Sequence, residues 1–149
     1  MSEAQDGLGL GEEFEGMRCL SNAEVAVILE KTKKEAEQQD KGVSEVFEDT
    51  LAYSKRFSGY TDVVNDAAAV QSLKDELQNK EFDQINEETG ELEKIKLKER
   101  DLVLLLNLAP FDYDEAVELI PSLQNKFAKD DIDAILNIIH NSTGRTKHV

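Results

Sequence analysis

The sequence predicts an all-α protein in which a compact helical domain follows an extended N-terminal arm. Both prolines, Pro110 and Pro121, lie late in the chain, so no proline ring interrupts a helix before residue 110. Apolar residues also recur at steps of three and four in several segments, which is the period of one helix face. We expect an arm over residues 1–20, a helical domain over 21–141 and a polar tail over 142–149.

The composition limits the class of protein. The chain has 149 residues, of which 40% are hydrophobic and 33% charged, enough apolar material for one modest core. The formal net charge of −15 argues against a chain that grips nucleic acid by itself, because phosphate binding needs clustered Lys and Arg. The lysines around Lys31–Lys34 and Lys94–Lys98 stand close to acidic residues, so we interpret them as solvated faces.

The first nineteen residues leave two interpretations open. They are rich in Gly and acidic residues, with Leu8, Leu10 and Phe14 as isolated apolar positions. They could form a disordered tail, which is common at a terminus, or an extended arm that places these three side chains on another surface. Composition alone favours the tail.

The first helix has a clear start. Ser21 is a good N-cap and Glu24 follows three residues later, which together make a capping box. We expect the helix to end near Gln38. Its predicted apolar face consists of Val25, Ile28, Leu29 and Thr32.

The segment from Val43 to Tyr60 is the one around which we expect the fold to be organised. Its apolar and small residues fall at helical spacing and predict an amphipathic helix ending near Phe57. One apolar stripe needs a cover, and we expect Leu102–Leu108 and Ile132–Ile139 to supply it. The stripe comprises Val43, Val46, Phe47, Thr50, Leu51, Ser54 and Phe57.

The remaining segments predict four more helices and one insertion. We expect helices starting at Thr61, over Leu97–Leu108, over Asp112–Ile120 and starting at Asp130. Residues 79–96 have no long helical stripe and read as an insertion, either a small exposed hairpin or a loop. The predicted core comprises Phe47, Leu51, Phe57, Leu104, Leu105, Leu119, Ile120, Leu123, Ile135 and Leu136.

The sequence carries no catalytic or metal-binding pattern, and we expect a non-enzymatic interaction protein without a cofactor or metal. Cys19 is the single cysteine, and His140 and His148 are the two histidines. The N-terminus has no secretory signal pattern. The longest apolar run, Leu102–Leu106, is far shorter than the ~20 residues of a membrane-spanning helix. We therefore expect a soluble intracellular protein with no membrane contact.

Three groups of motifs resemble the fourth-subunit family of eukaryotic RNA polymerase II, and they occur along the chain in the same order as in that family. The first comprises Val46-Phe47, Leu51-Ala52-Tyr53 and Arg56-Phe57-Ser58. The second runs from Asn107-Leu108-Ala109-Pro110 through Asp114-Glu115-Ala116 to Leu119-Ile120-Pro121-Ser122-Leu123. The third is Gly11-Glu12-Glu13-Phe14, followed by Cys19-Leu20, Glu24-Val25 and Ile28-Leu29-Glu30. The chain departs from the family pattern in the longer segment 79–96 and at Gly59, where many relatives have a basic residue.

The resemblance implies a fold like the C-terminal modules of helicases and ribonuclease D. It implies a nuclear, non-catalytic subunit that pairs with the OB-fold seventh subunit and the polymerase core. This pair would form a stalk for initiation and nascent RNA handling, with nucleic acid contacted mainly through the partner. The family's N-terminal part packs on that partner, which favours the arm over the tail. The implied partner-binding residues are Leu8, Leu10, Phe14, Leu20, Val25, Ile28 and Leu29.

Two other functions remain open from the sequence. One is the paralogous stalk subunit of another nuclear RNA polymerase, although the run from Leu119 to Leu123 favours polymerase II. The other is a free helical protein-interaction adaptor, which would be a stable monomer without an exposed apolar groove.

Overall fold

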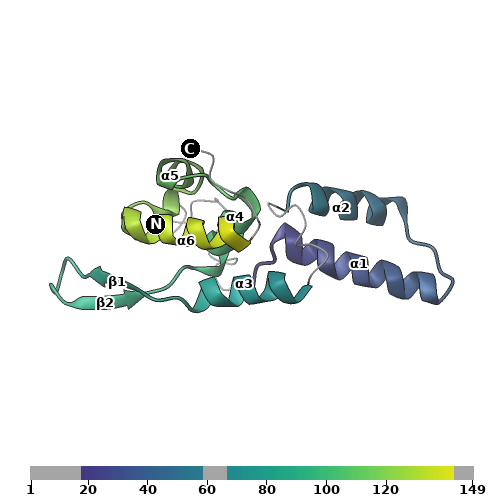
Figure 1. The fold of residues 1–149 in the computed structure, drawn as a ribbon, viewed down its shortest axis with the longest axis horizontal. Helices are drawn as coiled ribbons and strands as arrows, with labels where there is room; N and C mark the ends of the chain where they lie inside the picture. The colour runs from purple at the N-terminus through teal and green to yellow at the C-terminus, as the bar shows by residue number, and fades with distance from the viewer. Residues whose placement is uncertain (1–17, 59–66, 143–149) are drawn as a thin grey trace.

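The computed structural model describes residues 18–58 and 67–142, which form an elongated, predominantly helical molecule. The pair α1–α2 forms one end and a β-hairpin the other, with α4–α6 between them (Figure 1). The predicted all-α class is confirmed. The elements are α1 (Asn22–Gln38), α2 (Glu45–Arg56), α3 (Ala67–Asn79), β1 (Phe82–Ile85), β2 (Leu92–Ile95), α4 (Glu99–Leu108), α5 (Tyr113–Leu119), the 3₁₀ turn η4 (Pro121–Leu123) and α6 (Lys129–Ser142).

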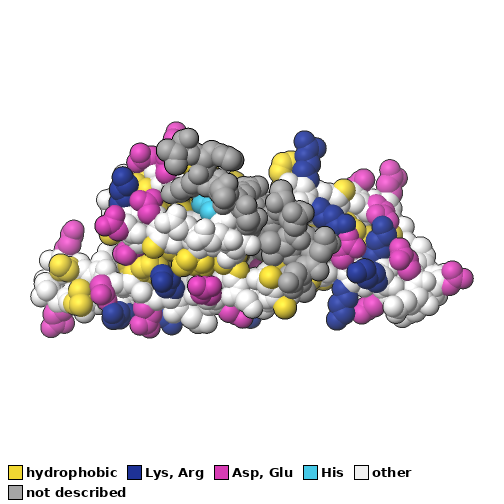
Figure 2. Space-filling model, viewed as in Figure 1, with side chains coloured by type: hydrophobic (Ala, Val, Ile, Leu, Met, Phe, Trp, Pro, Cys, Tyr) yellow, Lys and Arg dark blue, Asp and Glu magenta, His cyan; other side chains and the backbone are white. Residues whose placement is uncertain are grey.

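The main hydrophobic core lies where α3, α4, α5 and α6 meet. Leu102 and Leu105 of α4 and Ile135 and Leu136 of α6 are fully buried in it. The first turns of α1 contribute the small residues Ala23 and Ala26, which let α1 approach closely. Outside this core the visible face mixes positive and negative side chains without a large patch of one sign (Figure 2).

The predicted core residues divide between the structure's interior and its surface. Leu105, Ile120, Leu123, Ile135 and Leu136 are buried in the main core, Leu104 packs partly buried against it, and Leu51 is buried elsewhere. Phe57 and Leu119 are 46% and 47% exposed, so their prediction as core residues is wrong. Leu119 is the last residue of α5, and the next residue, Ile120, leaves the helical backbone conformation and is buried instead. Phe47 is partly buried but lies outside the main core.

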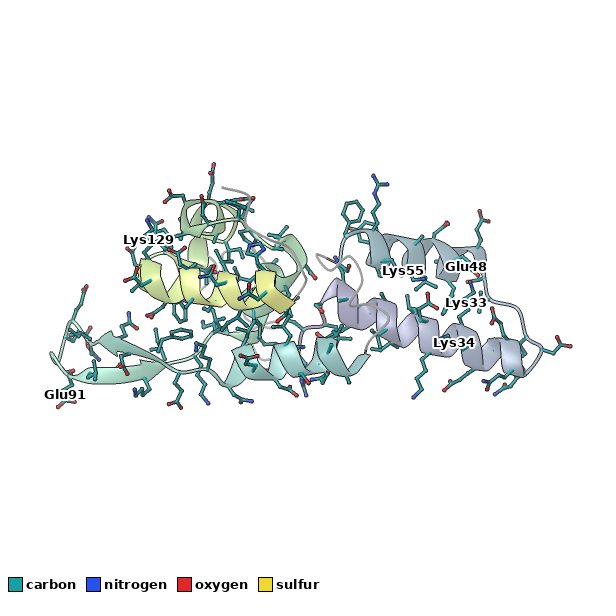
Figure 3. All side chains as sticks on the ribbon, in the orientation of Figure 1. Lys33, Lys34, Glu48, Lys55, Glu91 and Lys129 are labelled. Atoms are coloured by element: carbon teal, nitrogen blue, oxygen red, sulfur yellow. The ribbon has the colours of Figure 1, made fainter. Side chains whose placement is uncertain are left out.

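The helices α1 and α2 form an antiparallel hairpin of their own (Figure 3). The predicted capping box is confirmed: Ser21 Oγ accepts from Glu24 N at 3.2 Å, and Glu24 Oε1 accepts from Ser21 N at 3.0 Å. The predicted end at Gln38 is also confirmed. Two ion pairs link the helices, Lys33–Glu48 at 3.1 Å and Lys55–Glu30.

The expected cover of α2 is wrong. Its helix packs along α1, and none of its described residues belongs to the main core that α4 and α6 help to build. The physical reason is that the apolar stripe of α2 is really two lines. Leu51 and Ser54 are buried, whereas Val46 and Phe57 on the neighbouring line are exposed. One helix can cover only one of these lines.

The predicted apolar face of α1 is also corrected. Ile28 is 50% exposed and Thr32 is exposed, while Val27, which lies off the predicted stripe, packs against the main core. The buried positions of α1 are instead Ala23, Glu24 and Ala26. The core-facing side of α1 therefore carries small residues and one carboxylate, which hydropathy alone assigns to the wrong face.

Residues 82–95 form an antiparallel hairpin, the ordered alternative of the two left open for this segment. Phe82 pairs with Ile95 and Ile85 with Leu92 across the strands. Phe82 is buried and meets Phe127 edge to face, with ring centroids 5.6 Å apart. Ile85 and Leu92 are each 64% exposed, so the base of the hairpin belongs to the core and its tip does not.

The ends of the remaining helices agree with the sequence to within a few residues. α4 ends at Leu108, and Ala109 closes it in the left-handed conformation with φ of 44°. α6 begins at Lys129, so Asp130 lies in its first turn rather than at its cap. Thr61, the predicted cap of the third helix, lies outside the described residues. No helix in the described ranges is long and apolar enough to cross a membrane.

Candidate protein-interaction site

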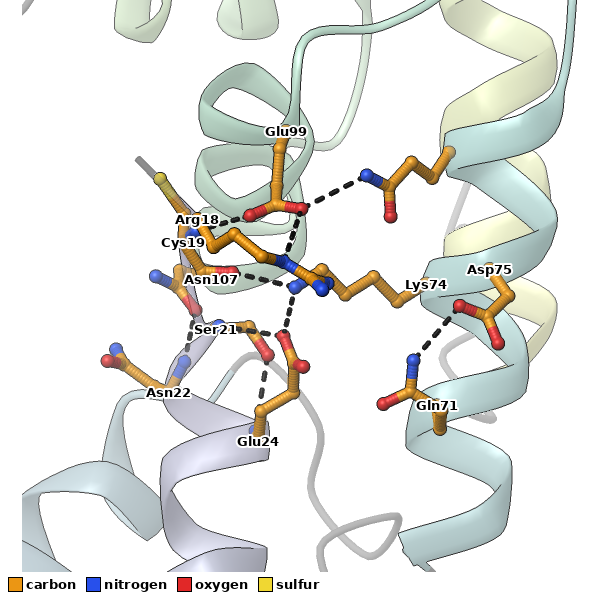
Figure 4. Close-up of polar contacts among 11 residues, drawn as sticks. Arg18, Cys19, Ser21, Asn22, Glu24, Gln71, Lys74, Asp75, Glu99 and Asn107 are labelled. Carbon is orange, nitrogen blue, oxygen red and sulfur yellow. Dashed lines mark hydrogen bonds and ion pairs between the residues drawn. The ribbon is translucent and has the colours of Figure 1, made fainter. Parts of the chain in front are cut away.

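A polar network fixes the chain where it enters α1. Lys74 of α3 is 1% exposed, and its Nζ lies 2.9 Å from Glu24 Oε1. The same ammonium group donates to the backbone carbonyl of Cys19 at 2.7 Å (Figure 4). A buried charge of this kind is tolerated because it has both an ion-pair partner and a hydrogen-bond acceptor.

Glu99 at the start of α4 holds the other side of the same segment. Its carboxylate accepts from the backbone N–H of Cys19 and from Gln78 Nε2 at 3.0 Å, and it lies 3.7 Å from Arg18 Nε. Burial opposes the charged form of Glu99. The hydrogen bonds from Cys19 and Gln78 and the charges of Lys74 and Arg18 outweigh it, so the pKa of Glu99 is lowered below its ordinary value.

Asn22 connects this network to α2. Its backbone N–H donates to Asn107 Oδ1 and its side-chain amide donates to the carbonyl of Phe57, each at 2.8 Å. Side chains from α3 and α4 therefore hold residues 18–22 in place next to the end of α2. We call this set the N-terminal anchor; it comprises Arg18, Cys19, Asn22, Glu24, Lys74, Gln78, Glu99 and Asn107.

The surface beside the anchor carries the predicted partner-binding residues that the structure describes. Leu20 and Ile28 are 52% and 50% exposed, and Val25 and Leu29 are partly buried. A groove of about 370 Å³ runs between α1 and α3, with Val27, Ile28 and Val70 in its lining. The predicted arm residues Leu8, Leu10 and Phe14 lie outside the described residues.

Sequence reasoning missed a second apolar surface on α2. Val46, Tyr53 and Phe57 are 74%, 60% and 46% exposed and form what we call the exposed α2 line. The rings of Tyr53 and Phe57 are 4.8 Å apart, and the Arg56 guanidinium lies 5.2 Å from the Phe57 ring. The spacing of seven and four residues was visible in the sequence, but it merges with the buried line into one stripe.

The surface beside the anchor and the exposed α2 line both carry large exposed apolar side chains. Within the described ranges, no group of three or more His, Cys, Asp or Glu side chains could hold a metal ion. His140 is buried, and its Nε2 lies 2.9 Å from the carbonyl oxygen of Pro110, where it ties α6 to the end of α4. Exposed leucine, isoleucine and aromatic side chains beside a fixed backbone suit a protein partner.

Comparison with known proteins gives two findings. The sequence profile of the family described as RNA polymerase Rpb4 matches residues 19–143. The chain is also 33% identical over 137 residues to DNA-directed RNA polymerase II subunit 4 of Arabidopsis thaliana. That alignment covers 89% of this chain and 86% of the Arabidopsis protein.

Proposed function

The chain belongs to the RNA polymerase Rpb4 family, and on this premise we propose that it is a non-catalytic subunit of DNA-directed RNA polymerase II in the nucleus. The family match over residues 19–143 is the observation that carries the proposal. In this role the chain pairs with the OB-fold seventh subunit and docks with it on the polymerase core. The pair forms the stalk that supports initiation and receives nascent RNA.

The surface beside the N-terminal anchor supports pairing with a protein. Leu20 and Ile28 leave about half of their area exposed next to the point where residues 1–17 join the fold. We propose that both bind the seventh subunit, together with Leu8, Leu10 and Phe14 of the arm and with Val25 and Leu29 of α1. Burying such apolar side chains favours a complex, and the gain is partly offset by the cost of ordering both partners.

The charge of the chain supports RNA contact mainly by the partner subunit. A net charge of −15 repels the phosphate backbone of a nucleic acid. The chain therefore gains little from the release of counterions, which is the main driving term for backbone binding. In the proposed pair, the seventh subunit therefore makes most of the contact with RNA.

Affinity purification tests the proposal as a whole. A tagged copy expressed in its native cells is expected to bring down the seventh subunit and the largest subunit of RNA polymerase II, identified by mass spectrometry. Recovery of the largest subunit of a different nuclear polymerase would assign the chain to that enzyme instead. A tagged copy that recovers no polymerase subunit contradicts the proposal.

Substitutions test the proposed interface separately. Leu20→Asp with Ile28→Asp is expected to weaken binding of the seventh subunit more than tenfold, because charges replace buried apolar contacts. Phe14→Ala is expected to weaken binding while leaving the thermal melt unchanged. Leu92→Asp is the matched control: Leu92 is 64% exposed on the hairpin, at the opposite end of the molecule. Equal loss of binding in the control would contradict the proposed interface.

A further inference from the structure

A second site lies at the base of the hairpin, away from the N-terminal anchor. A cavity of about 310 Å³ opens between β2, the first turn of α4 and the segment before α6. Its walls combine apolar, basic and other polar side chains, one of them acidic. They include Ile95, Lys96, Lys98, Asp101, Lys126 and Phe127.

The cavity gathers positive charge in an acidic chain. Lys96 and Lys98, from the link between β2 and α4, and Lys126, from the segment before α6, all line it, although the chain as a whole carries −15. Lys96 is within 3.9 Å of Glu81, and both side chains are about half exposed, so this pair is weak. The lysines that the sequence placed on a solvated face are thus brought together with a distant one, Lys126.

Lys126 lies among other cations. Partial burial and then repulsion from Lys98 lower the pKa of Lys126 from its ordinary value, and Arg100 acts in the same direction. The carboxylate of Asp101 opposes this effect. Ammonium groups this close repel each other, and an anion between them would remove the repulsion.

Asp101 offers an acceptor at the same place. Its side chain is 1% exposed, and Oδ1 accepts from Ser122 Oγ at 2.7 Å. Oδ2 has no hydrogen-bond partner among the described residues. Asp101 lines the cavity but Oδ2 itself is buried, so only a ligand donor that displaces its cover would pair this atom, which buried polar atoms normally require.

The start of α4 adds to the positive potential. Lys98 is its N-cap residue and makes no side-chain capping bond. The N-terminus of a helix carries a partial positive charge that attracts phosphate groups. In this cavity the helix start stands beside the lysines and the unpaired oxygen of Asp101, so it reinforces a site that those side chains already define.

We propose that this cavity binds a small phosphate-bearing molecule. Its phosphate oxygens pair with Lys96, Lys98 and Lys126, and a hydroxyl or amino group on the same molecule donates to Asp101 Oδ2. The volume of about 310 Å³ is at the lower end of the range for small-molecule pockets. The net charge of −15 disfavours a long polyanion, so a mononucleotide fits the site better than an RNA strand.

Titration of the isotope-labelled full chain with adenosine monophosphate tests the proposal by NMR. We expect amide shifts to concentrate in residues 95–101 and 126–127, with saturation at millimolar ligand or below. Inorganic phosphate, which lacks the ribose hydroxyls, is expected to bind more weakly at the same residues. Adenosine, which has no phosphate, is expected to leave them unshifted. Absence of saturable shifts with both the nucleotide and phosphate overturns the proposal.

Charge-removing variants make the assignment specific. Lys98→Gln and Lys126→Gln are each expected to weaken adenosine monophosphate binding about tenfold, because each removes a charge-assisted hydrogen bond. Lys34→Gln is the matched control on α1, where Lys34 points away from α2 (Figure 3). Equal affinity of all three variants overturns the proposal.

A third measurement distinguishes a mononucleotide from a nucleic acid as the source of the phosphate group. A twelve-nucleotide oligoribonucleotide is expected to bind more weakly than the mononucleotide. Tighter binding of the oligonucleotide, with a steep salt dependence and a loss in Lys126→Gln, overturns the small-molecule assignment in favour of nucleic acid. None of these measurements depends on polymerase subunits, so their outcome is independent of the proposed stalk function.

Discussion

Lys74 shows how much one side chain can control in this fold. It reaches from α3 into the junction of three elements, where it meets Glu24 of α1 and the carbonyl of Cys19. Glu24 in turn completes the capping box with Ser21. A helix cap, an interhelical ion pair and the path of the N-terminal backbone therefore share the same few atoms.

Substitution of Lys74 is expected to be costly. Lys74→Met keeps the length of the side chain but leaves the buried Glu24 without its cation, and removing one partner of a buried pair costs about 3–5 kcal/mol. Urea denaturation would measure the loss, with Lys34→Met on the surface of α1 as the control. A loss below about 1 kcal/mol would show that the junction relaxes and rehydrates Glu24.

Glu99 makes the stability of the fold depend on pH. Its pKa is lowered in the folded protein, so its contacts stabilise the fold above the ordinary pKa of 4.5, and this contribution is lost as the pH falls through the lowered value. Glu99→Gln is therefore expected to be less stable than the native chain at pH 7. The difference should shrink toward zero in acid. Chemical denaturation at pH 7 and at pH 3 measures the free energy of unfolding of both proteins. A difference between them that does not change with pH would show that the substitution acts through packing.

Among the secondary-structure elements, the hairpin separates cleanly into two parts. Phe82 at its base contacts Phe127 in the core, whereas Ile85 and Leu92 close an exposed tip. Replacing residues 86–91 with Asn-Gly, a dipeptide suited to a two-residue turn, is expected to change the free energy of unfolding by less than about 1 kcal/mol. Urea denaturation tests this. A loss comparable with that of Phe82→Ala, about 3–5 kcal/mol, would show that the tip supports the core.

The helices also show what the sequence could predict. Positions of elements followed from local rules: the capping box at Ser21, the end of α1 at Gln38 and the burial of α4 were all accessible from periodicity and capping. The element against which each helix face packs could not be predicted from these local rules. The two adjacent apolar lines of α2 look alike in sequence, and only the position of α1 decides that Leu51 is buried and Phe57 exposed.

The candidate sites were predictable to different degrees. Ile28 and Leu20 were identified from the resemblance and lie exposed beside the N-terminal anchor. The buried Lys74 was not anticipated, because a lysine at helical spacing reads as a solvated residue. Lys126 lies 28 residues from Lys98, so no local pattern connects them; only tertiary packing around Phe127 brings both to one cavity.

Across the described residues the packing is uneven. The main core joins α3–α6, while α2 packs along α1 with only Leu51 and Ser54 buried, and partly exposed ion pairs also link the two helices. Exposed ion pairs contribute only about 0–1 kcal/mol each. We therefore expect α2 to open locally without unfolding of the main core.

Native-state hydrogen exchange measures this difference. Amides of α2 are expected to exchange with a lower opening free energy than those of α4 and α6. Leu51→Ala should lower the protection of α2 further and leave α6 unchanged, because Leu51 lies outside the main core. Equal opening energies for α2 and α6 would show that the chain unfolds as one unit.

The N-terminal anchor has a consequence for affinity. Because residues 18–22 are held against α3 and α4, the point at which residues 1–17 attach is fixed next to Leu20 and Ile28. In the proposed complex, contact of that surface with the partner would make binding of residues 1–17 an intramolecular step with an effective concentration in the millimolar range. Two contacts that are each too weak to persist alone can then hold the complex together, and release of either one weakens the other.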